Sequence, residues 1–154
     1  MFNVVLVEPE IPQNTGNIGR LCLAASCTLH LVHPLGFELN DAALKRAGMD
    51  YWKNLTVVEH PSFAHFQLRA KGGRFFYCST KAKHAYWNIQ YQPGDYLIFG
   101  RETRGLPESL LEKNPDNAIT VPMSNPTARS LNLATAAGIV LYEALRQQTL
   151  QFER

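Results

Sequence analysis

Short apolar runs alternate with stretches of helical periodicity along most of the chain. Each run is five or six residues long and is rich in Val, Ile, Leu, Phe and Tyr. Nearly continuous apolarity, rather than strict alternation, is typical of strands that are covered on both faces. The runs are FNVVLV (2–7), TLHLVH (28–33), LTVVE (55–59), RFFYCS (74–79), DYLIFG (95–100) and AITVP (118–122).

Helical spacing of apolar residues occupies most of the intervals between these runs. It predicts a helix over 15–25 and a longer final helix over 131–148. Strands that alternate with helices indicate an α/β fold with a mostly parallel sheet and helices on both faces, and residues 1–154 read as a single domain. Shorter helices are predicted at 41–48, capped by Asn40 and ended by Gly48, at 62–70, opened by Pro61, and at 107–114.

One segment, TKAKHAYWNIQYQPG (80–94), joins two predicted strands with little helical pattern. Cations and aromatic rings together suit the phosphates and unstacked bases of RNA. A surface loop held down by its aromatic side chains explains the same composition equally well. The side chains concerned are Lys81, Lys83, His84, Tyr86, Trp87 and Tyr91.

Composition narrows the class of protein. Hydrophobic residues make up 45% of the 154 residues and charged residues 18%, which is typical of a soluble globular protein. No apolar stretch approaches the ~20 residues of a membrane span, and the N-terminus lacks the basic region of a signal peptide, so a cytoplasmic location is expected. A net charge of +2 permits binding to nucleic acid without indicating it.

Neither a disulfide nor a metal site is expected from the cysteine and histidine residues. Cys22, Cys27 and Cys78 are odd in number and lack C-x-x-C spacing, which favours free, buried thiols. The five histidines are scattered, and His30 and His33 would point to opposite faces of a strand. A zinc site is therefore not predicted.

The first of three polar loops is EPEIPQNTGNIGRLC (8–22), directly behind the first strand. Asn14 or Thr15 could cap the following helix, while Gly16 and Gly19 allow a close approach of other backbone. Arg20 would lie about one turn into that helix. A dinucleotide-dependent oxidoreductase is disfavoured, because the first glycine of its fingerprint and its acidic residue after the second strand are both missing.

The second and third loops also follow predicted strands, where α/β proteins bind ligands. In YLIFGRETRGLP (96–107), Glu102 stands between Arg101 and Arg104, and a local ion pair is its simplest role. In VPMSNPTARSLNLATAAGIVLYEA (121–144), Arg129, Ser130 and Asn132 precede the final helix, and Ser130 would make an ordinary N-cap.

These loops resemble the three motifs of SPOUT-class RNA 2′-O-ribose methyltransferases, and in particular of the TrmL (YibK-like) family that methylates the wobble cytidine or uridine of tRNA. The resemblance rests on NTGNIGR, FGRETRGLP and VPM…RSLNLATAAGIVLYEA, and it extends through EPEIPQNTGNI, HPLGFELND, RAGMDYW and YEALRQ over the whole chain. It implies an α/β fold with a C-terminal deep trefoil knot, and a homodimer formed through the C-terminal helix. It also implies a tRNA substrate, S-adenosylmethionine as methyl donor, and no metal.

The resemblance also assigns roles to residues. Arg20 and Asn132 are expected at the reacting centre, with Arg20 stabilising the alkoxide that develops on the ribose. Gly100 is expected to leave room for the adenosine. Asn14, Lys81 and Arg129 are expected to contact RNA. The residues expected to bind the cofactor are Cys78, Ser79, Gly100, Glu102, Val121, Met123, Ser130 and Leu131. A non-catalytic RNA-binding or ribosome-assembly module that retains the fold is the alternative.

Overall fold

The computed structural model describes residues 1–40, 42, 46 and 49–148. Within them, seven parallel strands form one sheet in the order β3-β2-β1-β6-β4-β7-β5. All six predicted strands are present with slightly different ends, and β5 was not predicted. The strands are β1 Asn3–Val7, β2 Thr28–Val32, β3 Val57–His60, β4 Phe75–Cys78, β5 His84–Ala85, β6 Tyr96–Phe99 and β7 Ala118–Thr120.

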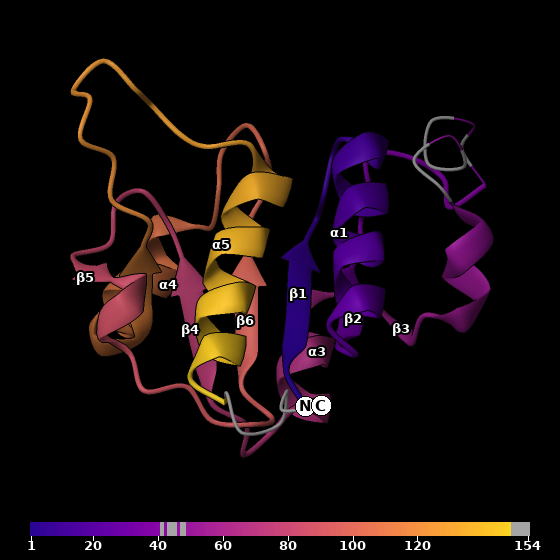
Figure 1. The fold of residues 1–154 in the computed structure, drawn as a ribbon, viewed down its shortest axis with the longest axis horizontal. Helices are drawn as coiled ribbons and strands as arrows, with labels where there is room; N and C mark the ends of the chain where they lie inside the picture. Colours follow the sequence, from indigo (N-terminus) through magenta and orange to yellow (C-terminus); the bar gives the residue numbers. More distant parts are fainter. Residues whose placement is uncertain (41, 43–45, 47–48, 149–154) are drawn as a thin grey trace.

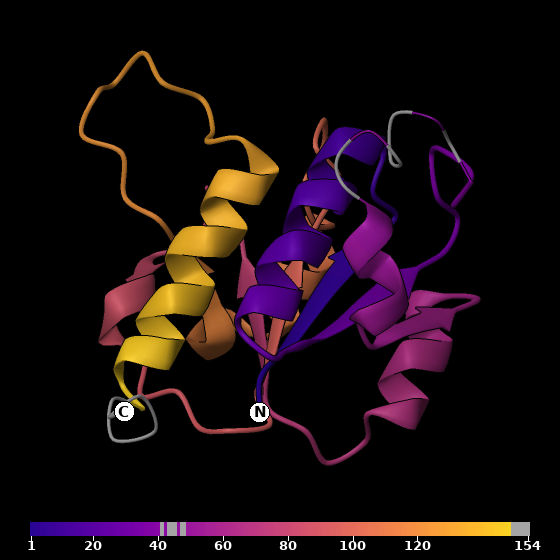
Figure 2. The same ribbon diagram turned by 45° about the vertical axis from the view of Figure 1, so that its right-hand side comes forward.

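Helices cover both faces of the sheet, as predicted (Figure 1). On one face lie α1 (Pro12–Ala24) and α5 (Leu133–Arg146), side by side in both Figure 1 and Figure 2. On the other lie α3 (Phe63–Arg69) and α4 (Glu108–Lys113). Short 3₁₀ helices are η1 (Met49–Asn54), η2 (Tyr86–Asn88) and η3 (Pro115–Asn117).

The alternation of side chains along β1 shows how the two layers form. Val4 and Leu6 pack into the core beneath α1 and α5, whereas Val5 and Val7 join the second core with Phe66 of α3. All four β1 side chains are buried because both faces of a parallel sheet are covered. This explains why the strand sequences are continuously apolar.

The strand register aligns the C-terminal ends of the central strands. Phe99, the last residue of β6, pairs with Leu6 of β1 and with Cys78, the last residue of β4. Cys78 pairs in turn with Ile119 of β7. The segments that follow β1, β4, β6 and β7 therefore leave the sheet at the same edge, which is where ligands bind in α/β proteins.

Helices α1 and α3 begin differently from the prediction. Ser62 is the N-cap of α3, since its hydroxyl accepts a hydrogen bond from the His65 backbone N–H at 3.1 Å, and Pro61 precedes the helix rather than standing in its first turn. Helix α1 begins at Pro12, so Asn14 and Thr15 do not cap it and are buried in its first turn. The helix predicted over 41–48 falls largely outside the described residues.

The glycines of NTGNIG accommodate aromatic rings of η1. A Cβ at Gly19 would lie 2.6 Å from the ring of Trp52, which would force the indole to move. The hydroxyl of Tyr51 donates to the carbonyl oxygen of Gly16. The nearest neighbours of Gly19 are thus the side chains of Trp52 and Leu55 rather than the backbone that was expected, and Gly16 contributes its carbonyl oxygen to Tyr51.

A buried histidine pair lies between β2 and β3, so the histidines are not all scattered. Asn3 donates its Nδ2 to the Gly94 carbonyl at 3.1 Å, which leaves its Oδ1 to accept from His30 Nε2 at 3.0 Å. His30 Nδ1 is then the acceptor for His60 Nε2, at 2.9 Å. His60 Nδ1 is buried and has no hydrogen-bond partner in the described structure.

Candidate functional site

A cavity of about 750 Å³ lies at the sheet edge where the strands end. All three loops singled out in the sequence contribute to it, together with the residues that follow β4. Its walls are formed by Ile11, Asn14, 78–81, 99–106, Thr120, Val121, Met123, 129–133 and Ala136. A volume of this size accommodates a cofactor or drug-sized ligand.

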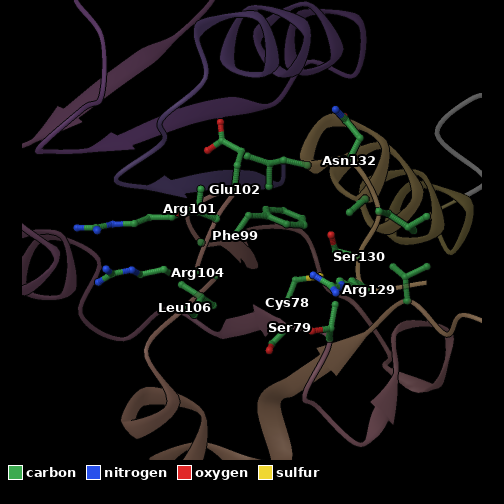
Figure 3. A pocket seen from close by; sticks show the side chains of 18 of the residues that line it. Cys78, Ser79, Phe99, Arg101, Glu102, Arg104, Leu106, Arg129, Ser130 and Asn132 are labelled. Carbon is green, nitrogen blue, oxygen red and sulfur yellow. The ribbon is translucent and has the colours of Figure 1, made fainter. Parts of the chain in front are cut away.

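Every residue expected to bind the cofactor lines this cavity, although the three loops are far apart in the sequence. Asn14, Lys81, Arg129 and Asn132 line it as well. Figure 3 shows Cys78, Ser79, Ser130 and Arg129 near one another, with Glu102 and Asn132 on the opposite side of the view. Arg20 is exposed on α1 and does not line the cavity.

The position of Arg20 differs from the sequence prediction. Since α1 begins at Pro12, Arg20 lies roughly two turns, or about 12 Å, from the start of the helix rather than one turn in. The helix start is the part of α1 that adjoins the cavity, because Ile11 and Asn14 line it. The Arg20 side chain is thus displaced along α1 from the cavity of its own chain.

The loop after β6 folds back on itself between its two glycines. Arg101 and Gly105 form an isolated antiparallel bridge, and the Gly105 N–H donates to the Arg101 carbonyl at 2.8 Å. A Cβ at Gly100 would lie 2.2 Å from the Gly105 carbonyl carbon, and Gly105 itself has a φ of +67°. The turn already requires glycine at both positions, whatever the approach of a ligand.

Glu102 is anchored to the first loop and not to its neighbouring arginines. Its carboxylate accepts hydrogen bonds from the backbone N–H groups of Glu10 at 2.9 Å and Ile11 at 2.6 Å. These N–H groups stand at the positively polarised N-terminus of α1, which favours a negative charge. The interpretation of Glu102 as a local ion pair between its two arginines is wrong, because its carboxylate binds backbone N–H groups and Arg101 Nη2 contacts Glu8 Oε1 at 2.9 Å instead.

Glu10 adds a second connection between the same two loops. Its Oε1 accepts from the Thr103 backbone N–H at 3.1 Å and from the Thr103 hydroxyl at 2.8 Å. These hydrogen bonds lower the pKa of the Glu10 carboxyl, with smaller contributions from Arg101 and Arg104. The carboxylates of Glu8, Glu10 and Glu102 together hold the loop after β1 against the loop after β6.

A chain of side-chain hydrogen bonds joins all three loops. Asn132 Nδ2 donates to Asn14 Oδ1 at 3.1 Å, and Asn14 Nδ2 lies 3.4 Å from Glu102 Oε2. Asn132 also caps α5, since its Oδ1 accepts from the N–H groups of Ala134 and Thr135 at 2.9 and 3.2 Å. The interpretation of Ser130 as the N-cap is therefore wrong. Asn14 is only 7% exposed, so its amide serves this connection from inside the protein.

Charge in the cavity wall is mostly positive. Lys81, Arg101, Arg104 and Arg129 carry cations, and Glu102 is the one acid among the lining residues. Lys81 forms an exposed ion pair with Glu108 at the start of α4. Burial raises the pKa of the Cys78 thiol to about 12, so this side chain stays neutral at neutral pH. The wall suits a ligand that carries a carboxylate or phosphate, and it does not contain a thiolate nucleophile.

Neither a metal-binding cluster nor a membrane-spanning helix occurs among the residues that the structure describes. Among these residues, no group of three or more His, Cys, Asp and Glu side chains is placed to hold a metal ion. The three cysteines are free. No helix in the same ranges is long and apolar enough to cross a membrane.

Comparison with known proteins agrees with the motifs. A tRNA (cytidine(34)-2′-O)-methyltransferase from Saccharophagus degradans is 49% identical over 148 residues, 96% of each chain. A solved structure that concerns 2-OH methylation of C/U34 on tRNA has a TM-score of 0.91 and 47% identity, and the match covers 97% of both chains. The resemblance to wobble-nucleotide 2′-O-methyltransferases is thereby confirmed.

A more distant solved structure contains the methyl donor. It is an AdoMet-bound rRNA methyltransferase from Sinorhizobium meliloti, with a TM-score of 0.82 and 28% identity over 94% of this chain and 56% of the other. The model of the SpoU rRNA methylase family matches residues 1–142, which include all three loops of the cavity. The chain belongs to the SpoU rRNA methylase family.

Proposed function

We propose that the protein methylates the 2′-hydroxyl of the wobble nucleotide of tRNA, with S-adenosylmethionine as the donor. The observation that carries this proposal is the hydrogen-bonded chain Glu102–Asn14–Asn132, which joins the three family motifs around one cavity. The relative from Saccharophagus degradans, named for this reaction, supports the choice of substrate.

The cavity fits the donor chemically. Phe99, Leu106 and Val121 offer apolar surface for an adenine ring, and the glycine-rich loop exposes backbone groups near Gly100. The cationic side chains of the wall suit the carboxylate of a methionyl group. Cys78, Ser79, Met123, Ser130 and Leu131 complete the proposed binding surface. When bound, S-adenosylmethionine supplies a methyl group that is already activated, and the proposed reaction needs no metal.

The chain's own task is to position the ribose and stabilise its 2′-oxygen. A guanidinium stays protonated at neutral pH, so Arg20 is a poor general base and acts by stabilising the developing alkoxide, while a nearby phosphate or water takes the proton of the 2′-hydroxyl. Asn132 holds the third loop through the α5 N-cap and through Asn14. Lys81 and Arg129 at the cavity wall contact RNA phosphates in this proposal, and Asn14 supports them from within.

We also propose that the working unit is a homodimer of one-domain subunits, each with a trefoil-knotted C-terminal segment. Tyr142 on α5 is 50% exposed, and the apolar side chains that precede α1 and α5, Ile11 and Leu131, are 41% and 38% exposed. Ile11 and Leu131 line the cavity and Tyr142 lies in the C-terminal half of α5, so exposed apolar side chains at both places are offered to a second subunit. Arg20 then reaches the cavity of the partner subunit. A cytoplasmic location follows from the proposed tRNA substrate.

The test is transfer of tritiated methyl from S-adenosylmethionine to bulk tRNA from a strain that lacks the corresponding gene. Nuclease mapping should locate a 2′-O-methyl group at the wobble nucleotide. Label elsewhere in tRNA would retain the activity and overturn the site. Cofactor binding without any transfer to RNA would instead support the non-catalytic RNA-binding module.

A further inference from the structure

The segment after β4 carries cations and aromatic rings of which only Lys81 lines the methyl-transfer cavity. Residues 80–94 include Lys81, Lys83 and His84 and contain no Asp or Glu. Lys83 and His84 are both exposed. The sequence allowed two interpretations of this segment, an RNA contact or a loop held down by its aromatic side chains. In the structure one aromatic residue of the segment, Tyr91, is buried, whereas another, Trp87, is exposed.

Tyr91 is the ring that holds the loop down. It is 3% exposed, packs against Phe76, and donates its hydroxyl hydrogen bond to the Tyr86 carbonyl at 2.7 Å. The backbone around it is fixed to the end of α5, because Gln147 accepts from the Tyr91 N–H and donates to the Ile89 carbonyl, both at 2.8 Å. The loop is therefore fixed on the C-terminal side of η2.

Trp87 lies between this anchor and β5, and its ring faces solvent. The side chain is 52% exposed. Its indole contacts the Tyr86 ring at a centroid distance of 5.3 Å and an interplanar angle of 66°. On the N-terminal side the backbone is fixed by the pairing of Ala85 with Thr120 of β7. A large π surface is thus left exposed on backbone that is held from both sides.

The position of Trp87 relative to the cavity suggests what covers the ring. Lys81, where the segment begins, and Thr120, the β7 partner of Ala85, both line the cavity. Trp87 follows Ala85 by two residues, so the exposed ring lies on the segment that leads from the cavity wall at Lys81 through β5, the edge strand of the sheet. A positively charged segment with an exposed aromatic ring is the arrangement that binds single-stranded nucleic acid.

We propose that Trp87 is a stacking surface for an unpaired RNA base beside the methylated nucleotide, with Lys83 as its neighbouring phosphate contact. This inference rests on the proposed function, since it assigns part of the RNA surface of the same site. The indole stacks on the base and makes no contact with the methyl donor. Because stacking tolerates different bases, Trp87 contributes affinity for an unpaired loop rather than recognition of one sequence.

Fluorescence gives a direct test, because the chain contains only two tryptophans, Trp52 and Trp87. In a Trp52→Phe variant, which keeps an aromatic ring against Gly19, all indole emission comes from Trp87. We expect an anticodon stem-loop RNA to quench this emission and to protect it from acrylamide. Emission that is unchanged when labelled RNA is shown to be bound would overturn the proposal. A change caused by dilution of the protein alone, without RNA, would instead place Trp87 in a subunit contact.

The affinity of variants for the same RNA, measured at several salt concentrations, distinguishes a stacking contact from an ionic contact. We expect Trp87→Ala to raise Kd about tenfold without changing its salt dependence, and Trp87→Phe to retain most of the affinity. Lys83→Ala should lower the slope of log K against log salt by about 0.7. Affinity for S-adenosylmethionine should stay constant in all three. Leu68→Ala on α3, where the side chain is 75% exposed, is the matched surface control.

The two proposals fail in different ways. Wild-type protein that binds the stem-loop but transfers no methyl group would remove the proposed function, whatever Trp87 does. Wild-type protein that methylates tRNA, with Trp87→Ala binding RNA as tightly as wild type, would remove only the role of Trp87. Thermal unfolding of Trp87→Ala at the wild-type temperature would exclude a folding defect as the cause of weaker binding.

Discussion

Glu102 shows how a single side chain acquires a role that its neighbours in sequence do not indicate. Two arginines flank it, yet its carboxylate accepts hydrogen bonds from the backbone at the start of α1 and adjoins the buried amide of Asn14. Arg101 pairs with Glu8, on the same first loop. Side-chain partners here are set by which strands are neighbours, since β1 and β6 are adjacent in the sheet but about ninety residues apart.

Glu102→Gln tests this role with almost no change of shape. The two oxygens of Glu102 accept from the N–H groups of Glu10 and Ile11. A glutamine has one oxygen and one NH₂ group, so one of these two N–H groups would lose its acceptor. We expect a loss of about 1–3 kcal/mol in the free energy of unfolding, together with weaker binding of S-adenosylmethionine. Denaturant titration and calorimetry measure the two quantities.

The matched control is Glu108→Gln, which removes a carboxylate from an exposed ion pair with Lys81. That substitution should leave unfolding nearly unchanged, because exposed pairs contribute little. If Glu102→Gln changed the free energy of unfolding as little as Glu108→Gln, the connection between the first two loops would not stabilise the fold. The proposed role of the Glu102–Asn14–Asn132 chain would then fail with it.

At the scale of elements, the histidine pair between β2 and β3 predicts how stability depends on pH. Burial lowers the pKa of His30 to about 4 and lowers that of His60 as well, with His65 and Arg69 adding to the effect. Both rings are therefore neutral in the folded protein at neutral pH. The unfolded chain binds protons more readily, since histidine titrates near pH 6.5 without burial.

The sign of the effect follows from linkage. A histidine with a lowered folded pKa contributes stability that is complete above about pH 6.5 and declines as the pH falls toward its folded value. We expect the free energy of unfolding to fall between about pH 6.5 and pH 4 in wild type, as measured by denaturant titration. His60→Gln should reduce this slope, because the glutamine amide donates to His30 Nδ1 and does not titrate. The exposed His84, changed to Gln, serves as control, and equal slopes in wild type, His60→Gln and His84→Gln would contradict the assignment.

The elements themselves could be read from the sequence, but their tertiary contacts could not. Continuous apolar runs predicted six strands, because burial on both faces leaves that pattern in any parallel sheet. The short β5 carries no such pattern, since two residues beside β7 suffice for it. Ser130 and Asn132 are comparable N-caps by propensity, yet Asn132 caps α5 and Asn14 accepts a hydrogen bond from its amide, a contact that the local sequence does not reveal. The cavity residues were identified through family motifs, and nothing in local periodicity marks them.

At the scale of the whole molecule, Arg20 lies away from the cavity of its own chain. In the proposed dimer, the second subunit brings its own Arg20 to that cavity. The helix that carries Arg20, α1, lies beside α5. Exposed apolar side chains occur on α5 at Tyr142 and just before it at Leu131. Homodimers with a twofold axis present the same surface twice, so an arginine displaced from one cavity can approach the other. The site proposed for one methyl transfer then contains residues of both subunits.

Subunit mixing decides whether Arg20 acts across the dimer. Arg20→Ala keeps an intact cavity, whereas Gly100→Ala disrupts it, because the new Cβ would meet the backbone of Gly105 at 2.2 Å. Each variant alone should be inactive in methyl transfer to tRNA. When the two are unfolded together and refolded at equal amounts, heterodimers unite an intact cavity with an intact Arg20, and about a quarter of the wild-type sites should recover. If Arg20 served its own cavity, no heterodimer would contain a complete site. Activity would then stay at the level of the separate variants, provided that sedimentation showed the mixture to be dimeric.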